Sequence, residues 1–169
     1  MERLGMKAFK MEKLPSFDFS NPPTDPHELT IKLVERLLEE TKRGVYSLSA
    51  SELGLPYRVF VMAGQPPVVC FNPRVVDETT EHIELEESCF SNPNLFVKIK
   101  RPRNIKVRYN DMDGNLHNEK FIGLTARAFL HELDHLNGFN YTRRANPIHL
   151  QRALNKKKQI DRALAKRAK

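Results

Sequence analysis

The stretch "HELDH" at residues 131–135 places two histidines four positions apart, with a glutamate directly after the first. On a helix, side chains at this spacing lie on one face at adjacent turns, so both imidazoles can reach the same metal ion. A catalytic zinc or iron site usually takes three protein ligands and keeps one position for water. The pattern therefore predicts a metal-binding helix, and it requires a third ligand from elsewhere in the chain.

Two classes of HExxH peptidase take the third ligand from a downstream residue, and this chain matches neither class. One class uses a later glutamate, but no glutamate follows Glu132, and the only aspartate after Asp134 is Asp161 in the basic tail. The other class has the pattern HExxHxxGxxH, and Tyr141 stands where its third histidine belongs. An endopeptidase is therefore the least favoured interpretation of the motif.

The remaining candidates for the third ligand are the two cysteines. Cys70 lies in the apolar run "VVCF" (68–71), which is typical of a cysteine that serves as a small buried side chain. Cys89 lies in "EESCFSNP" (86–93), between two runs with strand character, and most of its neighbours are polar. This setting does not fit a core position, so Cys89 is the candidate ligand.

Helical patterns occur in three parts of the chain. "DPHE" (25–28) predicts a helix start, with an N-cap Asp and a Pro at the first helical position, and Gly44 is expected to end this helix. A second helix is expected over about 124–137, carrying HELDH, and a third from 148 onward. One apolar stripe is expected to bury the first helix: Leu29, Leu33, Val34, Leu37 and Leu38.

Strand patterns fill the middle of the chain. Short β-branched or aromatic runs are separated by Pro, Asn and Gly, and "NDMDGNL" (110–116) offers an Asp-Gly hairpin turn. The runs are "YRVFVM", "VVCF", "EHIELEE", "LFVKIK" and "NIKVRY". A helix, several antiparallel strands and a further helix predict an α+β fold.

The composition is that of an ordinary globular protein. A chain of 169 residues with 40% hydrophobic and 29% charged residues predicts one domain with a core of its own. Only two cysteines are present, too few for a disulfide framework. No run of the sequence has the length of a membrane span and the N-terminus lacks the pattern of a signal peptide, so we expect a cytoplasmic protein without membrane contact.

The net charge of +7 is concentrated at the C-terminus. Residues 151–169 hold eight Lys and Arg and one Asp, whereas residues 1–150 hold 20 basic and 20 acidic residues. We therefore divide the chain into a catalytic domain at 1–150 and a basic amphipathic helix at 151–169. The apolar side of that helix is expected to hold Leu150, Ala153, Leu154, Ile160, Leu164 and Ala168.

The ordered segments of the chain resemble the peptide deformylase family. "ESCFS" (87–91) is similar to the family motif EGCLS, "HELDH" matches HExDH, and "LGLPYRVFVM" (53–62) and "FNPRVV" (71–76) lie in the family's order and spacing. The short deformylases of bacteriophages are the most similar type. The resemblance implies antiparallel β-sheets packed around a central HExDH helix, with helices at both ends.

The resemblance implies a metal-dependent hydrolysis that removes the N-formyl group from the initiator methionine of nascent polypeptides. Cys89, His131 and His135 would then bind the metal, which in this family is Fe(II), with Zn or Ni able to substitute. Glu132, adjacent to a ligand but not a ligand itself, is expected to carry the proton of the attacking water. Asp134 either orients a ligand imidazole or is a solvated charge.

The oxyanion site is where the sequence departs from the family. The family stabilises the formyl oxygen through the backbone N–H after the cysteine, here that of Phe90, and through a glutamine from the motif GΦGΦAAxQ. The matching stretch is "VYSLSASE" (45–52), in which Val45 and Ser47 replace the glycines and Glu52 replaces the glutamine. An ionised carboxylate cannot donate a hydrogen bond, although Glu52 would donate if neighbouring charges kept it protonated.

Binding of substrates and partners is also implied by the resemblance. Several residues match family positions near the methionine pocket: Tyr46, Leu48, Leu85, Leu124 and Ala128. The basic C-terminal helix is expected to bind the ribosome or its RNA, because a cationic face attracts phosphate backbones. The alternative is a deformylase-like protein with impaired catalysis that binds nascent chains or ribosomes. We expect a monomer.

Overall fold

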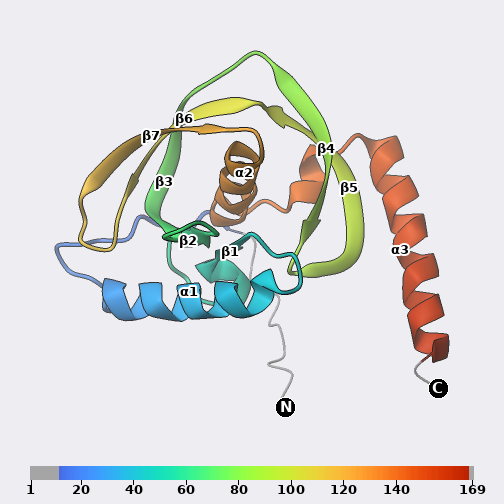
Figure 1. Ribbon diagram of the computed structural model, residues 1–169, viewed down its shortest axis with the longest axis horizontal. Coiled ribbons are helices and arrows are strands. Elements are labelled where there is room, and N and C mark those ends of the chain that lie inside the picture. The colour runs from blue at the N-terminus through green and yellow to red at the C-terminus, as the bar shows by residue number, and fades with distance from the viewer. Residues whose placement is uncertain (1–11, 168–169) are drawn as a thin grey trace.

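The computed structural model describes residues 12–167, and Figure 1 shows how its elements are arranged. In chain order they are α1 (Pro26–Thr41), β1 (Ser47–Ser49), η1 (Ala50–Leu53), β2 (Val59–Met62), β3 (Val68–Glu78), β4 (His82–Cys89), β5 (Asn92–Pro102), β6 (Asn104–Asn110), β7 (Leu116–Ile122), α2 (Leu124–Leu136), η2 (Tyr141–Arg144) and α3 (Pro147–Arg167).

The strands form two antiparallel sheets around helix α2. One sheet has the order β1-β2-β3-β6-β7, and the hairpin β4-β5 forms the second. Helix α2, which carries HELDH, lies between the sheets (Figure 1). The β6–β7 hairpin turns through Asp111–Gly114, as the Asp-Gly signal predicted. The predicted α+β fold is confirmed.

Helix α1 begins where its sequence signal places it. The Asp25 carboxylate accepts hydrogen bonds from the backbone N–H groups of His27 and Glu28, which satisfies two of the helix's unpaired donors. Leu33 is fully buried against the sheet, but Leu38 is 55% exposed. The predicted apolar stripe is therefore one residue too wide, since Leu38 lies past the face that packs.

The core around α2 explains why the metal-binding helix is rigidly held. Phe129 on α2 contacts Phe60 of β2 edge to face, with 5.1 Å between the ring centroids, and both rings are fully buried. Truncation of such a ring to alanine costs about 3–5 kcal/mol. Cys70 also packs in this cluster, and burial raises the pKa of its thiol well above the ordinary value. The expectation of a small buried side chain at Cys70 is met.

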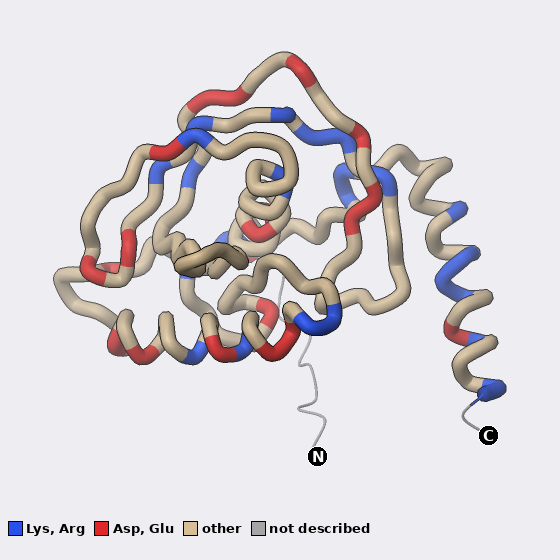
Figure 2. Tube along the Cα trace, in the orientation of Figure 1, with Lys and Arg blue, Asp and Glu red and all other residues tan. Residues whose placement is uncertain are grey.

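Helix α3 packs on the β4–β5 sheet through apolar residues of its first half, and further along it Asp161 accepts a hydrogen bond from Asn94 of β5. Ala153 is buried, and Leu150 and Leu154 pack beside it against the β5 side chains. Leu164 is 49% exposed, so its predicted place in a packed stripe is wrong, and Ala168 lies outside the described residues. The helix begins at Pro147, one residue before the predicted start at 148, and its end extends past the sheets in Figure 1, with cationic residues along its length in Figure 2.

Candidate metal centre

Two elements bring the three candidate ligands together. Cys89 is the last residue of β4, and His131 and His135 lie one turn apart on α2. Their ligand atoms all lie within 4.8 Å of one another, and the Cys89 Sγ is 3.2 Å from the His135 Nε2. All three side chains are at least largely buried. A cysteine separated from the histidines by more than forty residues thus reaches the same point.

Glu87 fixes the orientation of His131, and sequence reasoning missed this role. The His131 Nδ1 is 3.0 Å from the Glu87 Oε2, which leaves Nε2 free to face a metal ion. Arg101 donates two hydrogen bonds to Glu87 at 2.6 and 2.8 Å, and Arg127 donates a third at 2.6 Å. Glu87 opens the ESCFS segment, but its contacts with Arg101, Arg127 and His131 join residues far apart in the sequence.

These contacts set the charge state of Glu87. Burial by itself favours the neutral acid, but the hydrogen bonds from Arg101 and His131 lower the pKa of Glu87 to about 2. Glu87 is therefore a carboxylate at neutral pH, and it accepts the His131 hydrogen bond in its ionised form. A negatively charged partner of this kind makes the imidazole a better metal ligand.

Asp134 differs from both of its predicted roles. It is buried, and it accepts hydrogen bonds from Arg101 at 2.9 Å and from Arg144 on η2. It therefore neither holds a ligand imidazole nor points into solvent. Because Arg101 also binds Glu87, Asp134 supports His131 through that arginine and ties η2 to helix α2.

Glu132 is buried beside the three candidate ligands with one oxygen unused. Ser47 Oγ donates a hydrogen bond to the Glu132 Oε1 at 2.6 Å, while Oε2 is buried and has no hydrogen-bond partner within residues 12–167. Burial and the nearby charge of Glu52 raise the pKa of Glu132 well above the ordinary value. The carboxylate form of Glu132 is therefore a stronger base than that of an ordinary glutamate.

Glu52 closes the other side of the cluster. Its Oε1 is 3.0 Å from the Cys89 Sγ and accepts a hydrogen bond from Ser91 Oγ at 3.2 Å. Its Oε2 accepts from the backbone N–H of Ser49 at 3.1 Å, so that Glu52 completes a capping box at the start of η1. The local structure thus has its own use for a carboxylate at this position.

The pKa of Glu52 bears on a charge state that the sequence left open. Burial would raise it, but His135 and the Cys89 thiol outweigh burial, and the pKa of Glu52 is lowered. The raised pKa is that of the neighbouring Glu132. Glu52 therefore carries the negative charge of the pair.

The donor set fits a divalent transition metal. One thiol and two imidazoles are the ligands that zinc and iron take in proteins. Burial and the charge of Glu52 raise the pKa of Cys89, which disfavours a thiolate next to two carboxyls. A bound cation would compensate these charges, and it would also give the unpaired Glu132 Oε2 a polar neighbour.

The remaining predicted site residues are placed in different surroundings. Phe90 lies in the turn between β4 and β5, with its ring 5.5 Å from the Arg36 guanidinium. Three of the five proposed pocket residues are exposed, and two are not. Tyr46, Leu85 and Leu124 are 70%, 41% and 72% exposed, Ala128 is half-buried, and Leu48 is fully buried under α1. Leu48 has no surface with which to contact a ligand in this state.

In the described part of the chain, no helix is both long enough and apolar enough to span a membrane.

Known proteins are similar to this chain in sequence and in architecture. The profile of the polypeptide deformylase family matches residues 12–151. The peptide deformylase of Thermotoga neapolitana is 36% identical over 151 residues, covering 88% of this chain and 90% of that protein. A crystal structure of peptide deformylase from Thermotoga maritima superposes with a TM-score of 0.67 at 34% identity, covering 80% of this chain and 99% of the other. A ligand-bound class I type b peptide deformylase from Acinetobacter baumannii gives 0.74 at 25% identity, with 82% and 93% covered.

Proposed function

This chain belongs to the peptide deformylase family and is a metal-dependent hydrolase that removes the N-formyl group from nascent chains, and we propose that Cys89, His131 and His135 hold its metal ion. The mutual approach of these three ligand atoms within 4.8 Å is the observation that carries the proposal. The alternative, a binding protein with impaired catalysis, is not favoured, because the relatives are peptide deformylases and the cluster keeps Glu132.

We propose Fe(II) as the working metal, with Zn or Ni able to substitute. A thiolate and two imidazoles suit each of these ions, and redox-sensitive iron is compatible with the reduced thiols of a cytoplasmic protein. When bound, the ion supplies an acidified water and polarises the formyl oxygen. The remaining steps depend on the side chains around it.

Glu132 is the proposed proton carrier. Its Oε2 is buried and unpaired, and its raised pKa suits a group that takes a proton from water and passes it to the leaving amine. The Ser47 hydroxyl holds the other oxygen, Oε1, and thereby limits rotation of the carboxylate. Ser47 is therefore a positioning residue in this scheme.

The backbone N–H of Phe90 is the proposed donor to the developing oxyanion. Glu52 stands where a second donor is expected, and its lowered pKa makes it an acceptor. Loss of one donor of this type costs about 3–4 kcal/mol of transition-state stabilisation. We therefore propose that this enzyme turns over more slowly than a relative with a glutamine at the position of Glu52.

The side chain of the formyl-methionine is proposed to bind among exposed apolar residues. Tyr46, Leu85 and Leu124 present exposed apolar surface, Leu85 lies on the strand that carries Cys89, and Leu124 and Ala128 lie on the same helix as the histidines. Burial of one methionine side chain against such a surface contributes about 1.5–3 kcal/mol. Leu48 is fully buried, so it is not proposed to touch the substrate.

The basic face of α3 is proposed to bind ribosomal RNA. Arg152, Lys156 and Lys158 are exposed, as are Arg162 and Lys166 further along the helix. Lys157 is instead paired with Asp161 at 2.8 Å and is only partly exposed. We further propose that the protein works as a monomer in the cytoplasm.

Substituting five of the six exposed cations of the described part of α3 (Arg152, Lys156, Lys158, Arg162 and Lys166) by glutamine tests the ribosome proposal without disturbing Leu150, Ala153 and Leu154, which pack on the domain. Co-sedimentation with ribosomes should fall strongly and lose its steep dependence on salt. The matched control replaces five exposed lysines elsewhere: Lys32, Lys42, Lys98, Lys100 and Lys120. Equal loss in both variants would show a general charge effect and would refute a role of α3.

The function itself is tested by formate release. Protein loaded with Fe(II) in the absence of oxygen should release formate from formyl-Met-Ala-Ser but no acetate from acetyl-Met-Ala-Ser. It should also leave a peptide with a free N-terminus intact, because the chain has neither of the downstream ligands that the two classes of HExxH peptidase use. Absence of formate at full metal occupancy would contradict the proposed function.

A further inference from the structure

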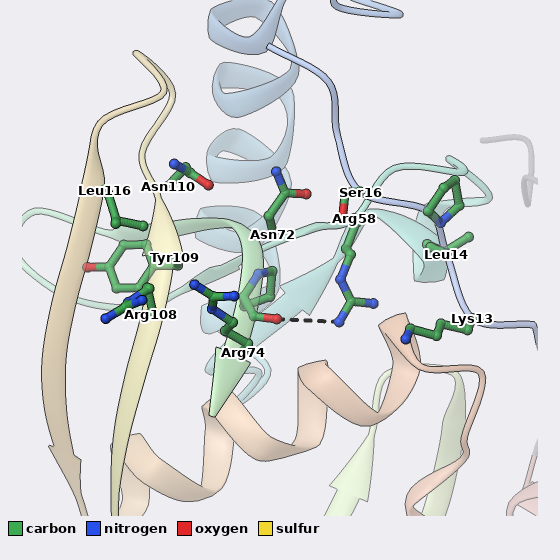
Figure 3. A pocket seen from close by; sticks show the side chains of 12 residues that line it. Lys13, Leu14, Ser16, Arg58, Asn72, Arg74, Arg108, Tyr109, Asn110 and Leu116 are labelled. Atoms are coloured by element: carbon green, nitrogen blue, oxygen red, sulfur yellow. Dashed lines mark hydrogen bonds between the residues drawn. The ribbon is translucent and has the colours of Figure 1, made fainter. Parts of the chain in front are cut away.

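A cavity away from the metal centre is lined by cationic side chains. Its volume is about 540 Å³, and Figure 3 shows Lys13, Arg58, Arg74 and Arg108 around it, with the Tyr109 ring alongside. Neither the metal cluster nor α3 contributes a lining residue, and no Asp or Glu is among the lining residues. A cavity of this size is in the range of small-molecule sites.

Two of these arginines are paired directly across the sheet. Arg74 of β3 stands opposite Arg108 of β6 in the antiparallel register. Like charges in directly opposite positions destabilise a sheet. Arg108 donates a hydrogen bond to the neutral Asn118 at 2.7 Å, and Arg74 has neither an ion pair nor a hydrogen bond to any residue between 12 and 167. Folding alone therefore gives no reason for two unneutralised charges here.

Arg58 adds a buried charge without an acidic partner. Arg58 is 8% exposed, and its guanidinium donates to the backbone carbonyls of Leu136 at 3.1 Å and Pro73 at 3.3 Å, and to the Asn137 side chain. No carboxylate in the described ranges forms an ion pair with it. Buried charges are normally paired, because an unpaired one loses hydration without compensation. The neutral acceptors fix the guanidinium in place but leave its charge uncompensated.

We propose that this cavity binds a phosphate-bearing anion, held by Arg58, Arg74, Arg108 and Lys13. Arginine forks match phosphate oxygens in geometry, and an anion between Arg74 and Arg108 would turn their repulsion into a shared contact. The cavity is larger than a single phosphate ion needs, so the phosphate belongs to a nucleotide. This nucleotide is either free or part of an RNA strand, and both offer the same phosphate chemistry.

The test measures binding of AMP, inorganic phosphate and octauridylate to the full-length protein at low salt. Chemical shifts of ¹⁵N-labelled protein should move at the Arg58 Nε–H and at the backbone amides of Asn72 and Asn110. The double variant R74Q/R108Q should weaken AMP binding by at least tenfold. It removes an unfavourable pair, so it should fold and be no less stable than the parent without ligand.

A matched control removes two exposed cations from the other sheet. K98Q/K100Q should bind AMP within twofold of the parent, and the five-glutamine variant of α3 should do the same. Deformylation of formyl-Met-Ala-Ser should be unchanged in R74Q/R108Q, so failure of this proposal is distinct from failure of the proposed function.

The comparison of probes identifies the source of the phosphate. If octauridylate binds more tightly than AMP and AMP competes with it, the cavity binds an RNA backbone, and the reverse order identifies a free nucleotide. The proposal is overturned if none of the three anions binds at millimolar concentration. It is equally overturned if R74Q/R108Q binds AMP as tightly as the parent does.

Discussion

Two segments meet at the metal centre, and they follow the family pattern to different degrees. The β4–α2 side supplies Cys89, His131 and His135; it matches HExDH fully and keeps the cysteine of EGCLS, with Ser88 and Phe90 as the differences. The β1–η1 side, residues 47–53, departs from them at Ser47 and Glu52. The departures are built into local structure, since Ser47 binds Glu132 and Glu52 caps η1. The proposed metal ligands therefore lie on the β4–α2 side, whereas the departures from the family at the proposed oxyanion site lie on the β1–η1 side.

The largest expected effect is the loss of the metal ion from variants of the ligands on the β4–α2 side. Cys89→Ser and His135→Ala should each abolish stable metal binding, because two protein ligands remain where three are needed. Metal content per chain, measured after gel filtration, checks this. Cys70→Ser is the matched control and should keep its metal, since Cys70 is a buried core side chain. A full complement of metal in Cys89→Ser would remove Cys89 from the ligand set.

Glu132→Gln should separate metal binding from catalysis. The variant should keep its metal and lose roughly 10²–10⁴ in kcat, the usual contribution of a positioned general base. The amide is isosteric and can still accept the Ser47 hydrogen bond. Turnover at the parent rate would assign the proton transfer to another group.

Glu52→Gln should act on the β1–η1 side alone and in the opposite direction. It restores a neutral donor near the reacting oxygen, so turnover should rise by up to roughly 10²–10³ with the metal content unchanged. Glu84→Gln, an exposed change on β4, should have no effect. An unaltered or lower rate in folded Glu52→Gln would show that the capping and thiol contacts of Glu52 matter more than its charge.

The smallest effect concerns the support of His131. Glu87→Gln removes a charged partner of the imidazole and should weaken metal affinity by roughly 10–100-fold, measured by competition with a chelator. The pKa of Glu87 is about 2 in the fold, below the value of about 4.3 for an unfolded glutamate. Its stabilising contribution is thus full above about pH 4.3 and is lost as pH falls toward 2. Glu87→Gln should therefore show a weaker loss of stability in acid, and an identical acid profile would contradict the assignment.

The sequence predicted the elements well because their signals are local. The N-cap at Asp25, the Asp-Gly turn and the HELDH spacing each depend on a few adjacent residues, and all three lie where they were expected. The extent of packing was less predictable. Leu38 and Leu164 continue an apolar period, yet both are exposed because the surface they would face ends before them.

At the site, residue identities were predictable but their electrostatics were not. Cys89 was found from its polar setting, and HELDH from its spacing. Glu87 and Arg101 were not selected, because their roles depend on a contact between β4, β5 and α2 that no local pattern encodes. The distribution of charge between Glu52 and Glu132 likewise depends on which carboxyl lies closer to His135 and Cys89 in space.

The most direct test of the account is an anaerobic titration of metal-free protein with Fe(II), with formate release from formyl-Met-Ala-Ser measured at each point. The rate should rise linearly and reach a plateau at one Fe(II) per chain, and Cys89→Ser should show no such rise over the same range. A plateau without formate release, or the same titration curve in Cys89→Ser, would contradict the claim that Cys89, His131 and His135 form the catalytic metal centre.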